Sequence, residues 1–393
     1  MRIGFDISQT GKAKAGCGYF ADSLIKHLVS CDKNNEYLLY SAFGNTFWDP
    51  EHGTSTCRLY KSNCTHLLDH FSHYDSLDFW STSAAIDEEK LGNPDIIHGN
   101  NFSCPRFTSA RFVYTLYDLS FLDHPEYTSE ENRWNCFNGV FNAAMQADLI
   151  IAISEYSRQR FLEIFPHFPI ERTRVVYLGS RFQHRDEEKP VADLEPGNFW
   201  LSVGTLEPRK NLRRTLLAYK KYIDIYNDPK PLVLAGGQGW LEDDLESFIV
   251  NIGLTKHIRR LGYVDDDTLN WLYKNCWAFV YPSIYEGFGL PVLEAMSLGA
   301  AVITSNTTSL PEVGKDAVLY VDPTSETDIV RELVKLNDGK LRDILKMNSQ
   351  KQAKKFAWSY TANQVIQAYI DVLELPKKTS VKEVKAKIPH FDI

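Results

Sequence analysis

The chain has 393 residues, of which 44% are hydrophobic and 13% aromatic, which is enough for two domains of ordinary size. Its formal net charge of −8 argues against a general nucleic-acid binder, because such proteins present a basic surface. Its seven cysteines are dispersed without a Cys-x-x-Cys pair, which indicates reduced thiols in a cytosolic protein.

The N-terminal half alternates apolar strands with helical patterns. It opens on a strand rather than a signal peptide, and no run approaches 18 apolar residues, so we expect no transmembrane helix. Strands are predicted at residues 2–7, 37–40, 95–98, 111–116, 148–153 and 175–178, and helices at 19–28, 132–147 and 155–165. Residues 45–69 read as irregular and either cover an acceptor site or form a surface excursion. The alternation predicts a parallel, doubly wound sheet.

Two features of this half are candidate ligand contacts. Gly16, Cys17 and Gly18 precede a predicted helix and form either a ligand loop or a plain tight turn, since the full Gly-x-Gly-x-x-Gly fingerprint is absent. Asp118 follows the strand at 111–116, at the end where open α/β sheets bind ligands. The alternative for Asp118 is a turn residue that caps the next segment. His124 nearby is read as structural.

Residues 181–198 are charged, contain two prolines and predict a linker between an N-terminal domain (1–180) and a C-terminal domain (199–358). Strands are predicted there at 199–203, 232–235, 258–261, 278–281, 300–304 and 319–322, and helices at 212–225, 241–252, 268–274, 291–298, 328–336 and 340–356. This half therefore predicts a second parallel, doubly wound sheet.

Arg209 and Lys210 lie between a strand end and a helix start. Cations are unfavourable at a helix N-terminus, so a bound diphosphate would explain them; the alternative is a solvated basic loop. The turn at 262–264 can offer backbone groups to the edge of a base. The three aspartates at 265–267 are assigned to capping of the next helix, and we predict no required metal.

The stretch 278–304 carries the strongest signal. A buried strand is followed by a loop with Gly287 and Gly289 and then by a helix, an arrangement whose free N–H groups bind anions. Glu286 and Glu294, which have seven residues between them, flank this site. Carboxylates accept hydrogen bonds from sugar hydroxyls. N–H groups for phosphate and carboxylates for hydroxyls together suit a nucleotide sugar.

The chain ends in a predicted helix at 359–375, expected to pack back toward the N-terminal domain, and in a basic tail at 376–393. The tail has lysines at positions 377, 378, 382, 385 and 387. It is interpreted either as a contact with an anionic membrane or as a solvated tail.

The sequence resembles the large family of retaining glycosyltransferases with the GT-B fold and the Glu-x7-Glu signature (glycosyltransferase family 4-like). The matching segments are VGTLEPRKN at 203–211, LAGG at 234–237, GYV at 262–264, the block at 281–305 and LPEVGKDAVLYVDP at 310–323. Looser matches in the N-terminal half are GCGYFADSLIKHL, YDLSFLDHPE and ADLIIAISEYSRQRF. Within the family it is most similar to bacterial mannosyltransferases of surface-polysaccharide assembly.

The resemblance implies two Rossmann-like domains facing across a cleft, with the donor on the C-terminal one. It implies that Arg209 and Lys210 bind the donor diphosphate. Glu286 would contact the hydroxyls of the transferred sugar, and Glu294 would accept hydrogen bonds from the ribose hydroxyls. Asp118 would lie near the sugar and acceptor, and Tyr117 stands where the family commonly has His. The other implied donor contacts are Gly16, Cys17, Gly18, Gly204, Thr205, Gly236, Tyr263, Val264, Gly287, Phe288, Gly289 and Leu290.

The resemblance further implies hexose transfer with retention, without a metal or other cofactor, from a nucleotide sugar to a glycan or lipid-linked oligosaccharide in polysaccharide or lipopolysaccharide O-antigen biosynthesis. GDP-mannose is the favoured donor, and UDP- and dTDP-sugars remain open. We expect a cytoplasmic location, with peripheral contact at the inner face of the plasma membrane as one interpretation, and no nucleic-acid partner. The alternatives are a nucleotide-sugar epimerase of the same fold and a non-catalytic nucleotide-sugar-binding subunit.

Overall fold

The computed structural model describes residues 1–11, 14, 16–44, 56–81, 86–104, 108–182, 186–226, 230–239 and 244–378. The chain forms two compact units. The first unit comprises Met1–Leu122, Glu130–Tyr177 and Trp358–Ile393, and the second comprises Asp123–Ser129 and Leu178–Ala357. A short segment of the N-terminal half of the sequence therefore groups with the second unit.

The first unit is built on a parallel sheet with the strand order β3-β2-β1-β4-β5-β6-β7. Its described strands are β1 (Arg2–Asp6), β2 (Glu36–Tyr40), β3 (Cys64–Leu67), β4 (Ile96–Gly99), β5 (Arg111–Leu116), β6 (Leu149–Ala152) and β7 (Thr173–Val175). In the register of β1, Ile3 lies between Tyr37 of β2 and Ile96 of β4. Strands β4 and β6 are buried along their whole length, as expected where helices cover both faces of a parallel sheet.

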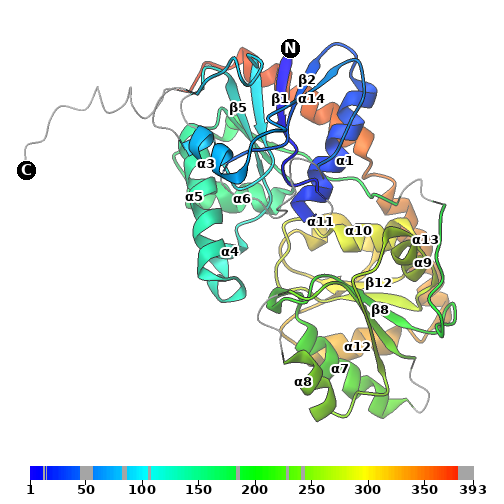
Figure 1. Cartoon of the computed structure of the whole chain (residues 1–393). Helices are drawn as coiled ribbons and strands as arrows, with labels where there is room; N and C mark the ends of the chain where they lie inside the picture. Colours follow the sequence, from blue (N-terminus) through cyan, green and yellow to red (C-terminus); the bar gives the residue numbers. More distant parts are fainter. Residues whose placement is uncertain are drawn as a thin grey trace, which may run out of the picture. The chain divides into compact units, whose positions relative to one another are not determined.

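The helices of the first unit lie on both faces of this sheet. Figure 1 shows α1 and α14 packed side by side on one face, with α5 and α6 on the other. The described helices are α1 (Gly16–Cys31), α3 (His73–Ser81), α4 (Ser120–Asp123, which ends at the unit boundary), α5 (Glu130–Gln146), α6 (Glu155–Ile164), η2 (Ile170–Arg172) and α14 (Trp358–Glu374). The core between the sheet and α3, α5 and α6 includes Trp80, Val140 and Phe161.

The second unit has a parallel sheet with the order β10-β9-β8-β11-β12-β13. Its strands are β8 (Trp200–Val203), β9 (Leu232–Ala235), β10 (Ile258–Gly262), β11 (Ala278–Tyr281), β12 (Val302–Ser305) and β13 (Leu319–Val321). Its described helices are η1 (Pro125–Tyr127), η3 (Pro208–Lys210), α7 (Leu212–Ile225), α8 (Leu245–Asn251), α9 (Asp266–Asn275), α10 (Leu290–Ser297), α11 (Leu310–Gly314), η4 (Lys315–Ala317), α12 (Glu326–Lys335) and α13 (Gly339–Ala353). Figure 1 shows α7 and α12 on one face and α9 and α10 on the other.

The predicted fold class, two doubly wound parallel sheets, is confirmed, and every predicted strand overlaps an observed one. Three local expectations were wrong. Residues 64–67 form the edge strand β3 instead of an irregular segment; their mixed sequence, Cys-Thr-His-Leu, is only partly buried and lacks an apolar pattern. Helix α1 begins at Gly16, so the glycines of 16–18 belong to the helix rather than to a loop. Strand β7 begins two residues earlier and ends three residues earlier than expected.

The end of the chain belongs to the first unit. The Tyr369 hydroxyl of α14 hydrogen-bonds His98 Nδ1 of β4 over 2.6 Å, and both side chains are buried. Beyond α14, Lys377 Nζ donates to the Ser109 carbonyl and Lys378 Nζ to the Ala144 carbonyl, each at 2.7 Å. The other lysines of the predicted basic tail (382, 385 and 387) lie outside the described residues. Within the described ranges, every helix is too short or too polar to cross a membrane.

Candidate active site

The topology of the second unit predicts where a ligand binds. Strands β8 and β11 are neighbours, but the chain leaves β8 toward β9 and leaves β11 toward β12. Loops that diverge from two adjacent parallel strands leave a crevice at their carboxyl ends, and open α/β proteins bind ligands there. The two loops concerned are residues 204–211 after β8 and 282–289 after β11. They contain the predicted residues Arg209, Lys210 and Glu286.

Asn211 fastens these loops together. It has left-handed backbone dihedral angles, with φ 61°, between η3 and α7. Its side-chain amide donates to the Pro282 carbonyl at 2.9 Å and to the Pro323 carbonyl at 2.7 Å. The loops after β8, β11 and β13 are therefore joined through one buried side chain, and this fixes the positions of Arg209 and Lys210.

Four charged side chains meet in the crevice. Lys210 Nζ lies 2.7 Å from Glu286 Oε1, and Arg209 Nη1 lies 3.0 Å from Glu286 Oε2. Arg209 also reaches Glu207, with Nη2 and Oε1 2.6 Å apart, and Lys210 Nζ is 3.8 Å from the same carboxylate. Glu207 and Glu286 are both buried. The two cations and two carboxylates balance in charge, as a buried cluster requires.

Glu286 is held by neutral donors as well. The Tyr281 hydroxyl donates to Glu286 Oε1 at 2.8 Å, and Ser283 Oγ donates to the same oxygen at 2.7 Å. Burial alone would raise the pKa of Glu286, but the charges of Lys210 and Arg209 outweigh it and bring the pKa down to about 2. Glu286 is therefore an ionised hydrogen-bond acceptor in a fixed orientation.

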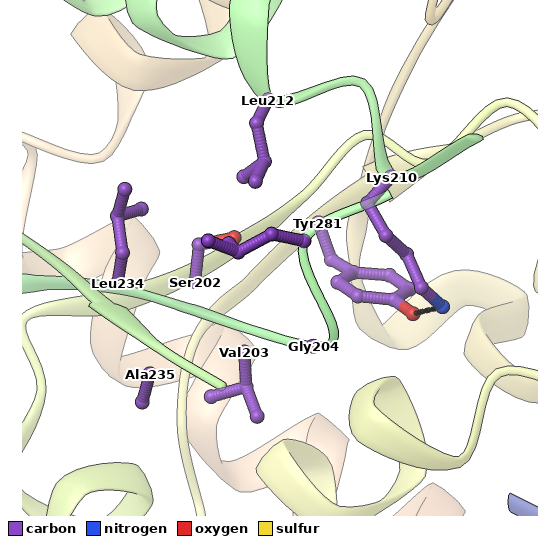
Figure 2. A pocket seen from close by; sticks show the side chains of 9 residues that line it. Ser202, Val203, Gly204, Lys210, Leu212, Leu234, Ala235 and Tyr281 are labelled. Carbon is purple, nitrogen blue, oxygen red and sulfur yellow. Dashed lines mark hydrogen bonds between the residues drawn. The ribbon is translucent and has the colours of Figure 1, made fainter. Parts of the chain in front are cut away.

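Lys210 borders a small pocket at the carboxyl ends of β8 and β9. Figure 2 shows its ammonium directed at the Tyr281 hydroxyl, 2.6 Å away, beside this pocket. Burial and the neighbouring Arg209 lower the pKa of Lys210, while Glu286 and Glu207 oppose the shift. The pocket is lined by Ser202, Val203, Gly204, Leu206, Lys210, Leu212, Leu234, Ala235 and Tyr281. Its lining combines the predicted Gly204 with apolar side chains that flank the ammonium.

Two glycines shape the backbone of the site. A Cβ on Gly236 would lie 2.0 Å from the Gly204 carbonyl oxygen, so the loops after β8 and β9 approach each other too closely for a side chain. Gly289 precedes α10 with φ +101°, a conformation that favours glycine. The predicted stretch Gly287 to Leu290 therefore leads directly into the N-terminus of α10, where backbone N–H groups lack intrahelical partners.

The remaining predicted residues of the second unit occupy separate places. Glu294 is buried on α10 and its partners are Arg181 and Tyr273. Tyr263 follows β10 and is 70% exposed. Asp265 caps α9 by accepting from the Thr268 N–H at 2.8 Å, which confirms the capping assignment. Among the described residues, no three or more His, Cys, Asp or Glu side chains are grouped as metal ligands would be.

The candidates of the first unit have structural partners. Asp118 accepts hydrogen bonds from the backbone and hydroxyl of Ser120, at 3.0 and 2.7 Å, which is the turn interpretation. The hydroxyl of Tyr117, the residue that departs from the family pattern, donates to the Asn100 carbonyl at 2.8 Å. A Cβ on Gly18 would lie 2.0 Å from the Gln9 carbonyl, so this glycine permits the close packing of α1. Functional roles for Asp118 and for residues 16–18 stay predictions.

Sequence reasoning missed several members of the site. Glu207, Tyr281 and Ser283 contact the predicted charged residues, and Arg181 pairs with Glu294. Tyr281 ends an apolar strand and reads as core, and Arg181 lies in a stretch that reads as a linker. Glu207 offered the one usable signal, because a carboxylate two residues before Arg-Lys in a short loop can pair with them.

Comparison with known proteins gives relatives for most of the chain. Residues 184–355 match the family of group 1 glycosyl transferases. The chain is 38% identical over 283 residues to O-antigen chain mannosyltransferase B of Escherichia coli, across 70% of this chain and 74% of that protein. It is 31% identical over 287 residues to the serotype-specific mannosyltransferase WbdA of Escherichia coli, across 68% of this chain and 34% of WbdA. It therefore spans about a third of WbdA.

A solved structure with the same fold is sucrose-phosphate synthase from Thermosynechococcus elongatus, with a TM-score of 0.69 at 18% sequence identity. The match covers 95% of this chain and 99% of that one, and it concerns the fold alone. The two doubly wound parallel sheets together have the GT-B fold of glycosyltransferases. The chain belongs to the group 1 glycosyl transferases.

Proposed function

We propose that this protein is a retaining, metal-independent hexosyltransferase. It moves a hexose, with mannose from GDP-mannose favoured, onto a glycan or lipid-linked glycan in polysaccharide or O-antigen biosynthesis. The sugar and the process are supported by the names of the relatives: one is an O-antigen chain mannosyltransferase, and the other is a serotype-specific mannosyltransferase. The observation that carries the proposal is the cluster of Arg209, Lys210 and Glu286 at the β8/β11 switch point, directly before α10.

In the proposed reaction the donor diphosphate leaves with its negative charge, and the protein stabilises that charge. Arg209 and Lys210 would donate hydrogen bonds to the diphosphate, and the N–H groups at the start of α10 add positive potential at the crevice. By analogy with oxyanion-hole donors, each contact contributes about 3–4 kcal/mol to lowering the barrier. No protein nucleophile is assigned, because attack on the same face as the departing diphosphate lets a donor phosphate oxygen take the acceptor proton.

The two carboxylates are assigned to the hydroxyl groups of the donor's sugars. Glu286 is ionised and fixed by Lys210 and Arg209, so it can accept hydrogen bonds from hydroxyls of the transferred sugar without reorganising. Glu294 is assigned to the ribose hydroxyls, and residues 287–290 to phosphate and sugar through their backbone. Asp118 and residues 16–18 are assigned to the acceptor side and to closure over the phosphates.

The test combines binding and turnover. The protein is incubated with GDP-mannose, UDP-glucose or dTDP-rhamnose, with and without a lipid-linked glycan acceptor, and nucleoside diphosphate release and product anomeric configuration are measured. We expect release that depends on the acceptor and a product with the donor's configuration. Donor consumption without a sugar product favours the epimerase alternative, binding without turnover favours the binding subunit, and an inverted product contradicts retention.

A further inference from the structure

A second buried ion pair lies in this unit, apart from the cluster at Glu286. Arg181 Nε lies 2.6 Å from Glu294 Oε1, and Arg181 Nη2 lies 3.4 Å from Glu294 Oε2. The carboxylate is almost completely buried, with 4% of its side chain exposed, whereas that of Arg181 is 21% exposed. The second contact is long, so the pair is a fork with one strong arm.

Arg181 is itself held in place by α9 and its own neighbours. Its Nη1 lies 3.0 Å from Asp266 Oδ1 at the start of α9. Phe182, the next residue, is buried against Tyr273 of α9. The Arg181 guanidinium lies 4.9 Å from the centroid of the Phe182 ring. Ser180, one residue before, hydrogen-bonds Ser297 of α10 over 2.8 Å. The segment around Arg181 is therefore docked on α9 and α10, which pack beside each other (Figure 1).

This arrangement leaves acceptor capacity on Glu294. An ionised carboxylate has about four acceptor sites. Arg181 supplies two donors, and the Tyr273 hydroxyl donates to Oε2 at 3.3 Å. Burial raises the pKa of Glu294 above its usual value, and the charge and hydrogen bonds of Arg181 act against that shift. Arg181 is the cation that contacts Glu294, and it constrains the plane in which the remaining lone pairs point.

We propose that Arg181 is a positioning residue for the donor: it orients the Glu294 carboxylate so that it accepts hydrogen bonds from the two ribose hydroxyls of the nucleotide. This inference rests on the proposed function, which assigns Glu294 to the ribose. Arg181 acts through Glu294 and does not itself contact the ligand.

The test measures nucleotide binding by calorimetry in the full chain, with GDP and UDP as probes and the tighter of the two carried forward. Arg181→Met should weaken binding of the ribonucleotide by about 10- to 100-fold, the range for hydrogen bonds to charged groups. It should leave binding of the matching 2′,3′-dideoxynucleoside diphosphate nearly unchanged, since that ligand has no hydroxyls for Glu294. Arg181→Lys, which keeps the charge but not the fork, should give an intermediate loss.

Arg260→Met is the matched control, because Arg260 pairs with Glu246 at the surface of the same unit, and it should bind both ligands like the wild type. Circular dichroism and thermal unfolding show whether each variant folds; if Arg181→Met does not, Arg181→Lys carries the comparison. Equal losses for the ribo- and dideoxy-nucleotides, or no loss for either, overturn the positioning role and leave the proposed function standing. If the wild type binds no nucleoside diphosphate, the proposed function falls and the inference with it.

Discussion

At the scale of single residues, the site consists of buried charged side chains that compensate one another in ion pairs. The sequence analysis assigned Lys210 and Arg209 to a bound diphosphate, and in the structure both contact Glu286. Removing one member of a buried pair leaves the other uncompensated, which typically destabilises a protein by about 3–5 kcal/mol. Variants of these residues should therefore change stability as well as catalysis, and the two effects must be measured separately.

Lys210→Met should lower the free energy of unfolding by about 3–5 kcal/mol, because it leaves Glu286 and Glu207 with only Arg209 as a cation. The double variant Lys210→Met/Glu286→Gln restores the balance of charge and should recover much of that stability. It should remain inactive, because both ligand-binding groups are lost. Urea unfolding with parallel turnover assays checks this, and additive losses of stability in the double variant would contradict the coupling.

Arg209→Ala should reduce kcat by about 10²–10³-fold, as does the loss of one oxyanion-hole donor. The control is Arg213→Ala, because Arg213 lies one helical turn further on α7 and pairs with Asp244 at the surface. Steady-state kinetics with saturating donor compare the two. Near-normal turnover in a folded Arg209→Ala enzyme would remove Arg209 from the mechanism.

At the scale of elements, single polar side chains join loops and helices that the sequence keeps far apart. Asn211 joins the loops after β8, β11 and β13, and His98 joins β4 to β5 and α14. His98 Nε2 lies 2.8 Å from Thr115 Oγ1, so both ring nitrogens have partners. Such contacts cannot be read from hydrophobic periodicity, because they involve one residue of each element.

Asn211→Ala should destabilise the protein more than Asn211→Gly does. Both variants lose the two amide donors, at about 1 kcal/mol for each hydrogen bond. Both residues have to adopt the left-handed φ of 61°, but this conformation is strained only for alanine, at an additional cost of about 1–2 kcal/mol. Chemical denaturation measures the difference, and equal losses for the two variants would show that backbone strain at this position is unimportant.

His98 predicts a pH dependence. Burial lowers the pKa of His98 from 6.5 to about 3, so the folded protein keeps it neutral while the unfolded chain takes up a proton below about pH 6.5. The stability linked to this residue is therefore lost as pH falls from 6.5 toward 3, by about 1.4 kcal/mol per pH unit well below 6.5.

His98→Gln removes this titration, so the wild type should lose stability relative to the variant as the pH falls from 7 to 5. Asp6, whose pKa burial raises to about 6, changes stability in the opposite direction but is present in both proteins and cancels in the difference. Urea unfolding at several pH values measures that difference. A constant difference would contradict a buried neutral His98.

At the scale of the whole molecule, the site depends on the order of strands in the second sheet. Adding GDP or UDP should protect backbone amides from hydrogen exchange most strongly at residues 204–211 and 282–290, the loops at the β8/β11 switch point. Exchange in β4 and β5 of the first sheet should change little. Mass spectrometry of peptides follows this, and protection spread evenly over both sheets would argue against a site at this crevice.

Much of the fold could be predicted from the sequence because a strand buried on both faces is a short continuous apolar run. The runs at 111–116 and 278–281 lie where predicted, and the switch from such runs to helical periodicity marks the alternating units. Strand β3 was missed because it is an edge strand of mixed, partly buried residues. The glycine loop before α10 was visible because Gly289, in a left-handed conformation, and Pro291 mark the start of that helix.

By itself, the sequence determined the class of fold, the family and the candidate charges at Arg209, Lys210 and Glu286. Only the tertiary structure decided how those charges are paired. Strands β8 and β11 are far apart along the chain and adjacent in the sheet, so Arg209 and Lys210 in the loop after β8 reach Glu286 in the loop after β11. Arg181 likewise reaches Glu294 from a segment that reads as a linker. Periodicity reflects the burial of each element separately, whereas a pairing between polar groups depends on which elements the sheet places side by side.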